Sequence, residues 1–162
     1  ADATATFPRD SGEDPFYRVV AGFFHKPFER STLSGELYLQ TVGAEEPGDY
    51  LEFASSDRFA RGELWLLGRY YAMASWGQEL TPLVSGTLSS TVNLGDGSAF
   101  LGPSVSISVS DDVQAVLGGF LGLGERPPEV SFDEILLGEE LALGSEFGMN
   151  PPMAFVQMRA YF

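Results

Sequence analysis

Apolar and polar residues alternate along most of the chain from residue 16 onward. The clearest stretch covers residues 98–110, where one set of alternate positions is Leu, Pro, Val, Ile and Val and the other is Gly and Ser. A period of two residues is typical of a β-strand with one apolar and one polar face. The pair Asp111-Asp112 then predicts a very short turn before the next strand, over residues 113–123.

The same alternation predicts strands on both sides of this hairpin. Gly95-Asp96-Gly97 supplies the positive φ angle that a tight hairpin needs, and short turns are also expected at residues 27–32 and 77–79. The remaining predicted strands cover residues 2–7, 16–26, 34–42, 60–76, 80–93 and 153–162. The first of them is weak, because Pro8 stops it.

Two long connections separate these strands and hold many of the acidic residues. They cover residues 44–57 and 125–152. In the second, Ser131 and Glu134 have the spacing of a capping box, which predicts a short helix over residues 131–143. The sequence is expected to form one domain over residues 1–162, with residues 1–14 as a weak first strand or an N-terminal segment.

Composition narrows the possible functions. The chain has 162 residues, a length that suits one domain, and its 19 glycines and 13 % aromatic residues suit a β protein with tight turns. Nucleic-acid binding is not expected, because the net charge is −14 and only nine residues are Lys or Arg. Cysteine is absent, which excludes disulfides, thiolate metal sites and cysteine nucleophiles.

Alternation alone is compatible with two kinds of barrel. A soluble binding barrel points its apolar residues inward, whereas a membrane barrel points them toward lipid. The apolar faces are almost free of charge at mid-span, and Tyr17, Phe23, Trp76 and Phe162 lie near their ends, where an interfacial girdle would lie. The polar faces carry small or hydroxylated residues with a few charges of both signs, whereas a solvated sheet usually carries more Lys and Glu. These features favour the membrane barrel.

The last seven residues, VQMRAYF, place Val156, Met158, Ala160 and Phe162 on one side of a strand. This ending resembles the C-terminal insertion signal of Gram-negative outer-membrane β-barrels, and the alternation of short turns with long loops resembles the same family. The resemblance implies a bacterial outer-membrane location among lipids and lipopolysaccharide. It also implies insertion by the barrel-assembly machinery, periplasmic termini and outward-facing acidic loops. The stretch from Arg61 to Phe162 is also similar to the C-terminal half of larger outer-membrane barrels.

The expected fold is therefore an all-β, antiparallel transmembrane β-barrel of about eight strands, with a short helix in the last outer loop. The alternative is the C-terminal part of a larger, roughly 12-stranded barrel completed by other strands. The polar faces are expected to direct one network into the lumen: Arg18, Glu36, Arg61, Glu63, Arg69, Gln157 and Arg159. In an eight-stranded barrel these groups would form an ion-paired plug, and in a wider one they would line a water-filled channel.

The candidate chemistry is sparse. His25 is the single histidine and is predicted near the periplasmic end of its strand, the wrong end for the Ser/His/acid set of outer-membrane lipid enzymes. The acidic loops lack the Asp-x-Asp-x-Asp-Gly spacing of a calcium loop, and no cofactor or metal site is expected. We expect a non-enzymatic structural or interaction subunit of the cell envelope that contacts another envelope protein through its acidic outer loops. The alternatives are a pore or channel for small solutes, then a soluble lipocalin-like binding barrel, and then a lipid-modifying enzyme.

Overall fold

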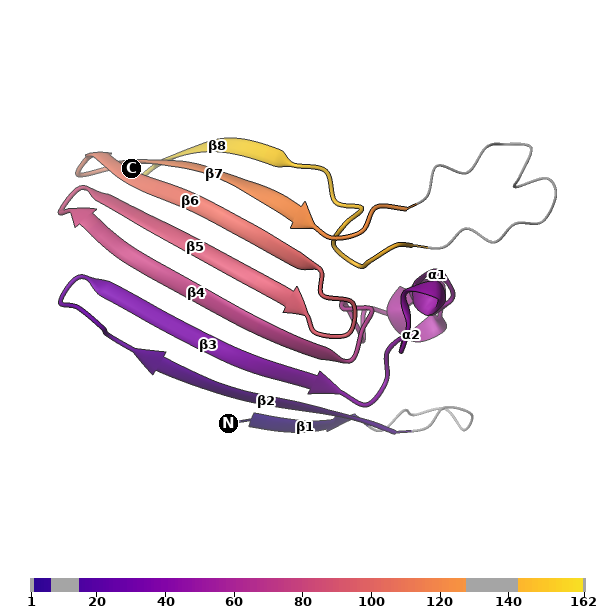
Figure 1. The fold of residues 1–162 in the computed structure, drawn as a ribbon. Coiled ribbons are helices and arrows are strands. Elements are labelled where there is room, and N and C mark those ends of the chain that lie inside the picture. Colours follow the sequence, from indigo (N-terminus) through magenta and orange to yellow (C-terminus); the bar gives the residue numbers. More distant parts are fainter. Residues whose placement is uncertain (1, 7–14, 128–142, 162) are drawn as a thin grey trace, which may run out of the picture.

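The computed structural model describes residues 2–6, 15–127 and 143–161, the first of these as backbone only. In it, eight strands form one antiparallel sheet in which each strand pairs with its neighbours in sequence (Figure 1). The all-β prediction is confirmed. The strands are β1 (Asp2–Thr6), β2 (Phe16–His25), β3 (Ser31–Gln40), β4 (Tyr70–Thr81), β5 (Val84–Asn93), β6 (Ala99–Ser110), β7 (Val113–Leu123) and β8 (Met153–Ala160).

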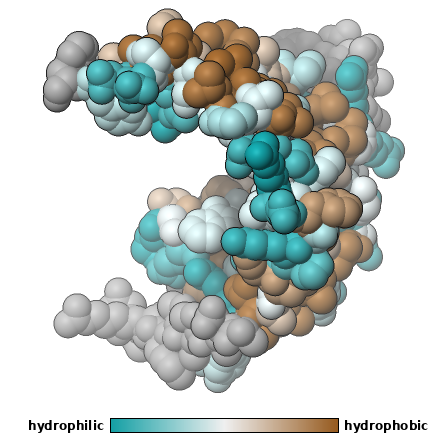
Figure 2. Space-filling view, turned by 90° about the vertical axis from the view of Figure 1, so that its left-hand side faces the viewer, coloured by the Kyte–Doolittle hydropathy of each residue, from teal (hydrophilic) through white to brown (hydrophobic). Residues whose placement is uncertain are grey.

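The sheet is strongly curved but open. Pairing runs in order from β1 to β8, and the described residues show no pairing between these two outer strands. Figure 2, viewed from the end that holds the short turns, shows a C-shaped cross-section around a hollow. The structure therefore shows an antiparallel sheet with a convex and a concave face, and not a closed barrel.

The strand register determines which side chains share a face. Leu88 lies opposite Trp76 on one side and Pro103 on the other, and Val105 lies opposite Leu117, so these residues are on the same face. This is the convex face, and Figure 2 shows brown residues along the outer side of the C. The serine positions of β6 face the hollow together with Ser85, Thr87, Ser89 and Thr91 of β5, whereas Ser90 lies on the convex face.

The largest difference from the sequence prediction lies before β4. The strand expected over residues 60–76 begins only at Tyr70, and residues 41–69 form a long connection. This connection holds η1 (Pro47–Asp49), α1 (Tyr50–Ala54) and α2 (Asp57–Ala60). Leu64 and Leu66 alternate as strand residues would, but they are only 3 % and 8 % exposed. Their spacing reflects an extended segment that buries alternate side chains without pairing in the sheet.

The turn between β4 and β5 also differs from the prediction. Gly77 and Glu79, expected in a turn, continue β4 and pair with β5, and the chain reverses at Pro82-Leu83. Proline has a fixed φ near the value that the first central position of a β-turn needs, which explains this placement. The predicted helix over residues 131–143 falls almost entirely on residues 128–142, outside the described part of the chain. Among the described helices, none is long and apolar enough to cross a membrane.

Candidate functional site

The convex face carries exposed apolar side chains over seven neighbouring strands. No convex position of β2 to β8 is Asp, Glu, Lys or Arg. Some of the larger apolar side chains on this face, among them Leu33, Leu101 and Ile107, are half-buried, and the others are between 37 % and 73 % exposed. They are Tyr17, Val19, Phe23, Leu37, Leu39, Tyr70, Trp76, Leu80, Leu88, Val105, Val109, Leu117, Leu121, Leu123, Val156 and Met158.

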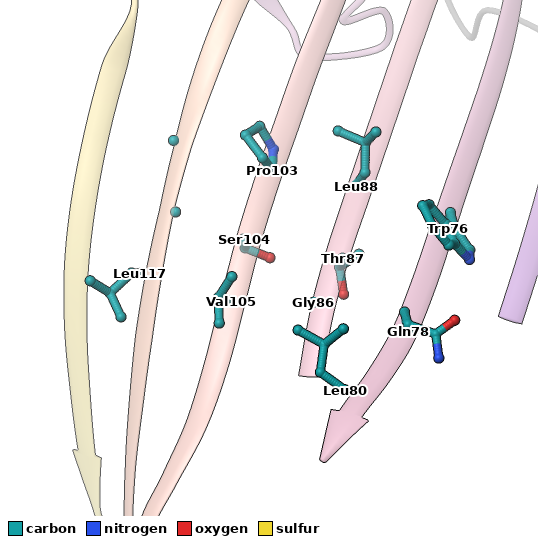
Figure 3. A pocket seen from close by; sticks show the side chains of 12 residues that line it. Trp76, Gln78, Leu80, Gly86, Thr87, Leu88, Pro103, Ser104, Val105 and Leu117 are labelled. Carbon is teal, nitrogen blue, oxygen red and sulfur yellow. The ribbon is translucent and has the colours of Figure 1, made fainter. Parts of the chain in front are cut away.

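This surface contains a shallow apolar groove of about 530 Å³ over β4 to β7 (Figure 3). Trp76, Leu80, Leu88 and Leu117 line it, and Gly86 leaves open space between them. A soluble monomer rarely exposes a contiguous apolar patch of more than a few hundred Å². A charge-free face that spans seven strands is therefore a surface for an apolar environment or a large partner.

We call the end of the sheet next to α1 and α2 the loop end. Three residues of the predicted lumen network lie together there. Arg18 of β2 donates a hydrogen bond to the backbone oxygen of Glu63, and Arg61 pairs with the Glu63 carboxylate at 2.8 Å. This bond from Arg61 lowers the pKa of Glu63. The guanidinium groups of Arg18 and Arg58 lie 4.9 Å and 5.2 Å from the ring centre of buried Phe16. Arg61 and Glu63 thus belong to the long connection and not to a strand.

The other four members of the predicted network lie apart from this group. Arg69 precedes β4 and contacts the 41–69 connection, with 2.6 Å to the Glu45 carboxylate and 2.8 Å to the Gly43 oxygen. On β8, Arg159 donates to Gln157 at 3.0 Å. Glu36 is exposed in the middle of β3. The structure therefore distributes the seven residues over separate small groups.

A buried polar cluster occupies the concave face at the loop end, and we call it the loop cluster. It contains Glu146, Asp96, Tyr50, Tyr71 and Asn93. The Glu146 carboxylate accepts hydrogen bonds from the Tyr71 hydroxyl at 2.5 Å, the Asn93 amide at 2.7 Å and the Leu67 backbone N–H at 2.8 Å. Asp96 accepts from the Tyr50 hydroxyl at 2.8 Å and from the Glu146 N–H at 2.7 Å. The cluster thus ties the connections after β3, β5 and β7 to strands β4 and β5.

The pKa values of the two carboxylates in the loop cluster shift in opposite directions. Burial raises the pKa of Glu146 above its ordinary value, although the bonds from Leu67, Tyr71 and Asn93 oppose this. Burial also acts on Asp96, but hydrogen bonds from Glu146 and Ser98 outweigh it and hold the pKa of Asp96 below its ordinary value. Both carboxylates are occupied by donors from the protein, so the arrangement fits a structural clasp.

A row of aromatic rings crosses the concave face next to the loop cluster. Phe155, Phe120 and Phe100 stack in sequence across β8, β7 and β6, with ring centres 5.6 Å and 5.4 Å apart. Phe147 continues the row to Tyr71 and from there to Tyr38 on β3. The sequence analysis did not predict this row, although the aromatic residues in phase with the polar positions of β3, β4, β6, β7 and β8 were a visible signal.

The remaining candidate groups are exposed or isolated. His25 ends β2 at the short-turn end and is exposed. Val156 and Met158 of the predicted insertion signal are 73 % and 71 % exposed on the convex face, and Phe162 lies outside the described residues. Within residues 2–6, 15–127 and 143–161, no group of three or more His, Asp or Glu could hold a metal ion.

Comparison with known proteins gives no match: no family model, no curated protein and no solved structure is similar to this chain.

Proposed function

We propose that the protein is a membrane-embedded β-sheet that forms part of the wall of an outer-membrane type barrel, with a non-enzymatic structural or interaction role. The observation that carries this proposal is the convex face, which is largely apolar and exposed and carries no Asp, Glu, Lys or Arg from β2 to β8. In a soluble barrel the same residues would be packed together inside. Instead, Leu88 and Val105 are 44 % and 37 % exposed.

The open sheet supports the larger of the two expected barrels. Backbone N–H and C=O groups cannot stay unpaired in hydrocarbon, so β1 and β8 each need a neighbouring strand there. A barrel that contains these eight strands and closes through further strands would have more than eight. We infer that additional strands, from the same protein or from another copy, complete the wall.

The acidic connections remain the proposed contact surface for another envelope protein. The 41–69 connection exposes Glu45, Glu46, Asp49 and Glu52 around α1. The loop cluster and Arg18 hold this connection against the sheet. The partner would carry complementary basic groups.

A pore is the second candidate, because a wall of more than eight strands would enclose a wide lumen. The concave face supports this role away from the loop end, where β5 and β6 line the hollow with serine and threonine.

Detergent-free solubility is the first test of membrane embedding. We expect the protein to aggregate without detergent and to enter phosphatidylcholine vesicles with protection of β2 to β8 from protease. A monodisperse protein in plain buffer would contradict the proposal. Single-channel current in planar bilayers would then support the pore, whereas insertion without current, together with co-purification of an envelope protein, would support the structural role.

A further inference from the structure

The turn between β2 and β3 differs in charge from the rest of the chain. The turn itself, residues 26–30, contains Lys26 and Arg30 and one acid, Glu29, and it directly follows His25. Lys26 and His25 are the only lysine and the only histidine of a protein with a net charge of −14. Phe24 and Phe28 lie beside these basic groups and are 66 % and 71 % exposed. Exposed aromatic rings next to Lys and Arg are typical of a membrane interface, where rings enter the headgroup layer and cations contact phosphate.

The basic groups of this turn are available to a ligand. Lys26 is exposed, and no ion pair is found for it among the described residues. Arg30 lies 3.7 Å from Glu79, and both side chains are about half exposed, at 57 % and 45 %. An exposed pair at this distance contributes little, so an incoming phosphate can compete for the guanidinium.

A second apolar groove begins beside this turn on the convex face. It has a volume of about 470 Å³ and crosses β2 to β4. Ala21, Leu33, Leu37 and Ala72 line it. His25 lies opposite Leu33 in the register, and Leu33 lines the groove, so the turn lies at the short-turn end of the groove.

We propose that the β2–β3 turn and this groove form a binding site for one anionic phospholipid. The phosphate contacts Lys26 and Arg30, and one acyl chain lies along the small residues of the groove. The contrast between the two ends of the sheet selects this ligand. At the turn, Lys26 and Arg30 balance Glu29 and Glu79, whereas the 41–69 connection at the opposite end exposes several acids and would repel the same headgroup. The site rests on the membrane embedding proposed above and adds to it a preferred lipid class and a location.

The test uses the full protein in bilayer discs with equal amounts of phosphatidylglycerol and phosphatidylcholine, followed by native mass spectrometry of the lipids that stay bound. We expect phosphatidylglycerol to be retained preferentially by the wild type. One cation near an anionic lipid surface corresponds to about a fivefold change in retention, so Lys26→Gln should lower the ratio of the two lipids by about that factor. The double variant Lys26→Gln/Arg30→Gln should lower it further.

Arg126→Gln is the matched control, because it removes one exposed cation from the connection after β7 and should leave the lipid ratio unchanged. Ala72→Phe fills the groove and should reduce retention of both lipids, whereas Ala115→Phe, on the same face but outside the groove, should not. Soluble glycerol phosphate should not displace the lipid, since it has no acyl chain.

Several outcomes would overturn the site without touching the membrane proposal. These are equal retention of both lipids by the wild type, an equal loss with Arg126→Gln, and displacement by glycerol phosphate, which would indicate a plain phosphate site. Displacement by a polyglutamate peptide would assign the turn to an acidic protein partner instead. A protein that fails to enter the bilayer discs at all would contradict the proposed function itself.

Discussion

The two faces of the sheet are built from the same strands, yet they are organised differently. The convex face is nearly uniform: most of its side chains are apolar, and many are exposed, from β2 to β8. The concave face is uneven, with hydroxyl residues over part of its area and a buried cluster and aromatic row at the loop end. The stability of a face without specific contacts depends on the medium around it. The stability of a face with many specific contacts depends on the individual residues that make them. Mutations on the two faces should therefore have different consequences.

The largest effect is expected from a charge on the convex face. Ile107→Arg should destabilise the inserted protein by ~2–4 kcal/mol, the cost of a cation near the middle of a bilayer. Ser106→Asn, one residue away on the concave face, should have little effect. Urea titration of the vesicle-embedded protein measures both, and equal tolerance of the two substitutions would contradict the assignment of the faces.

On the concave face, the largest effect is expected in the loop cluster. Glu146→Ala leaves the donors of Tyr71, Asn93 and Leu67 without their acceptor, and an unsatisfied buried group costs about 1–3 kcal/mol. Glu45→Ala removes an exposed carboxylate and should cost less than about 1 kcal/mol. Hydrogen exchange at the Leu67 amide should accelerate in the first variant alone. Unchanged protection there would mean that the cluster does not hold the connection.

A smaller effect is expected from the aromatic row. Phe120→Leu keeps an apolar side chain but removes the ring that stacks between Phe100 and Phe155, and it should cost about 1 kcal/mol. Phe28→Leu, at an exposed ring with no stacking partner found in the described residues, is the control for the same chemical change. A similar loss in both variants, measured by urea unfolding, would show that stacking is not the cause.

The smallest effect is expected from pH, and it should come from the loop cluster, because the convex face carries no Asp, Glu, Lys or Arg. The raised pKa of Glu146 gives a stabilising contribution that is complete below its ordinary pKa of 4.5 and disappears as pH rises through the folded-state value. The lowered pKa of Asp96 has the opposite sign: its contribution is present above 3.8 and is lost as pH falls further.

Stability should therefore rise from pH 7 toward pH 4.5 and fall below 3.8. Glu146→Gln should abolish the rise and keep the fall, and Asp96→Asn should do the reverse. Unfolding curves across this range provide the measurement. A rise that survives Glu146→Gln would assign it to another group.

Local pattern was sufficient for the strands but not for the contacts between distant segments. The hairpin of β6 and β7 and its Asp111-Asp112 turn follow directly from alternation and turn chemistry. The same alternation was misleading at Leu64 and Leu66, because an extended segment that crosses a buried surface also hides every second side chain. A period of two residues in the sequence indicates which side chains are buried. It does not indicate whether the segment pairs with a neighbouring strand.

The loop cluster could not be predicted from the sequence, because its members are far apart along the chain. Tyr71 and Glu146 are separated by 75 residues, and Asn93 and Glu146 by 53. Glu146 was interpreted as one more acid in a long connection, and Asp96 as part of a hairpin. Nothing within a few residues of either distinguishes a buried carboxylate from a solvated one. The convex face, in contrast, is a property of each strand by itself and was visible in the sequence.

The open outer edges of β1 and β8 have a consequence for biogenesis. In water, a bare edge is tolerable but invites pairing with foreign strands. In the hydrocarbon of a bilayer, the unpaired N–H and C=O groups of a bare edge are too costly to remain. Under the proposed membrane embedding, insertion and the pairing of β1 and β8 with further strands must occur together, so whatever supplies those strands would also determine when the protein leaves water.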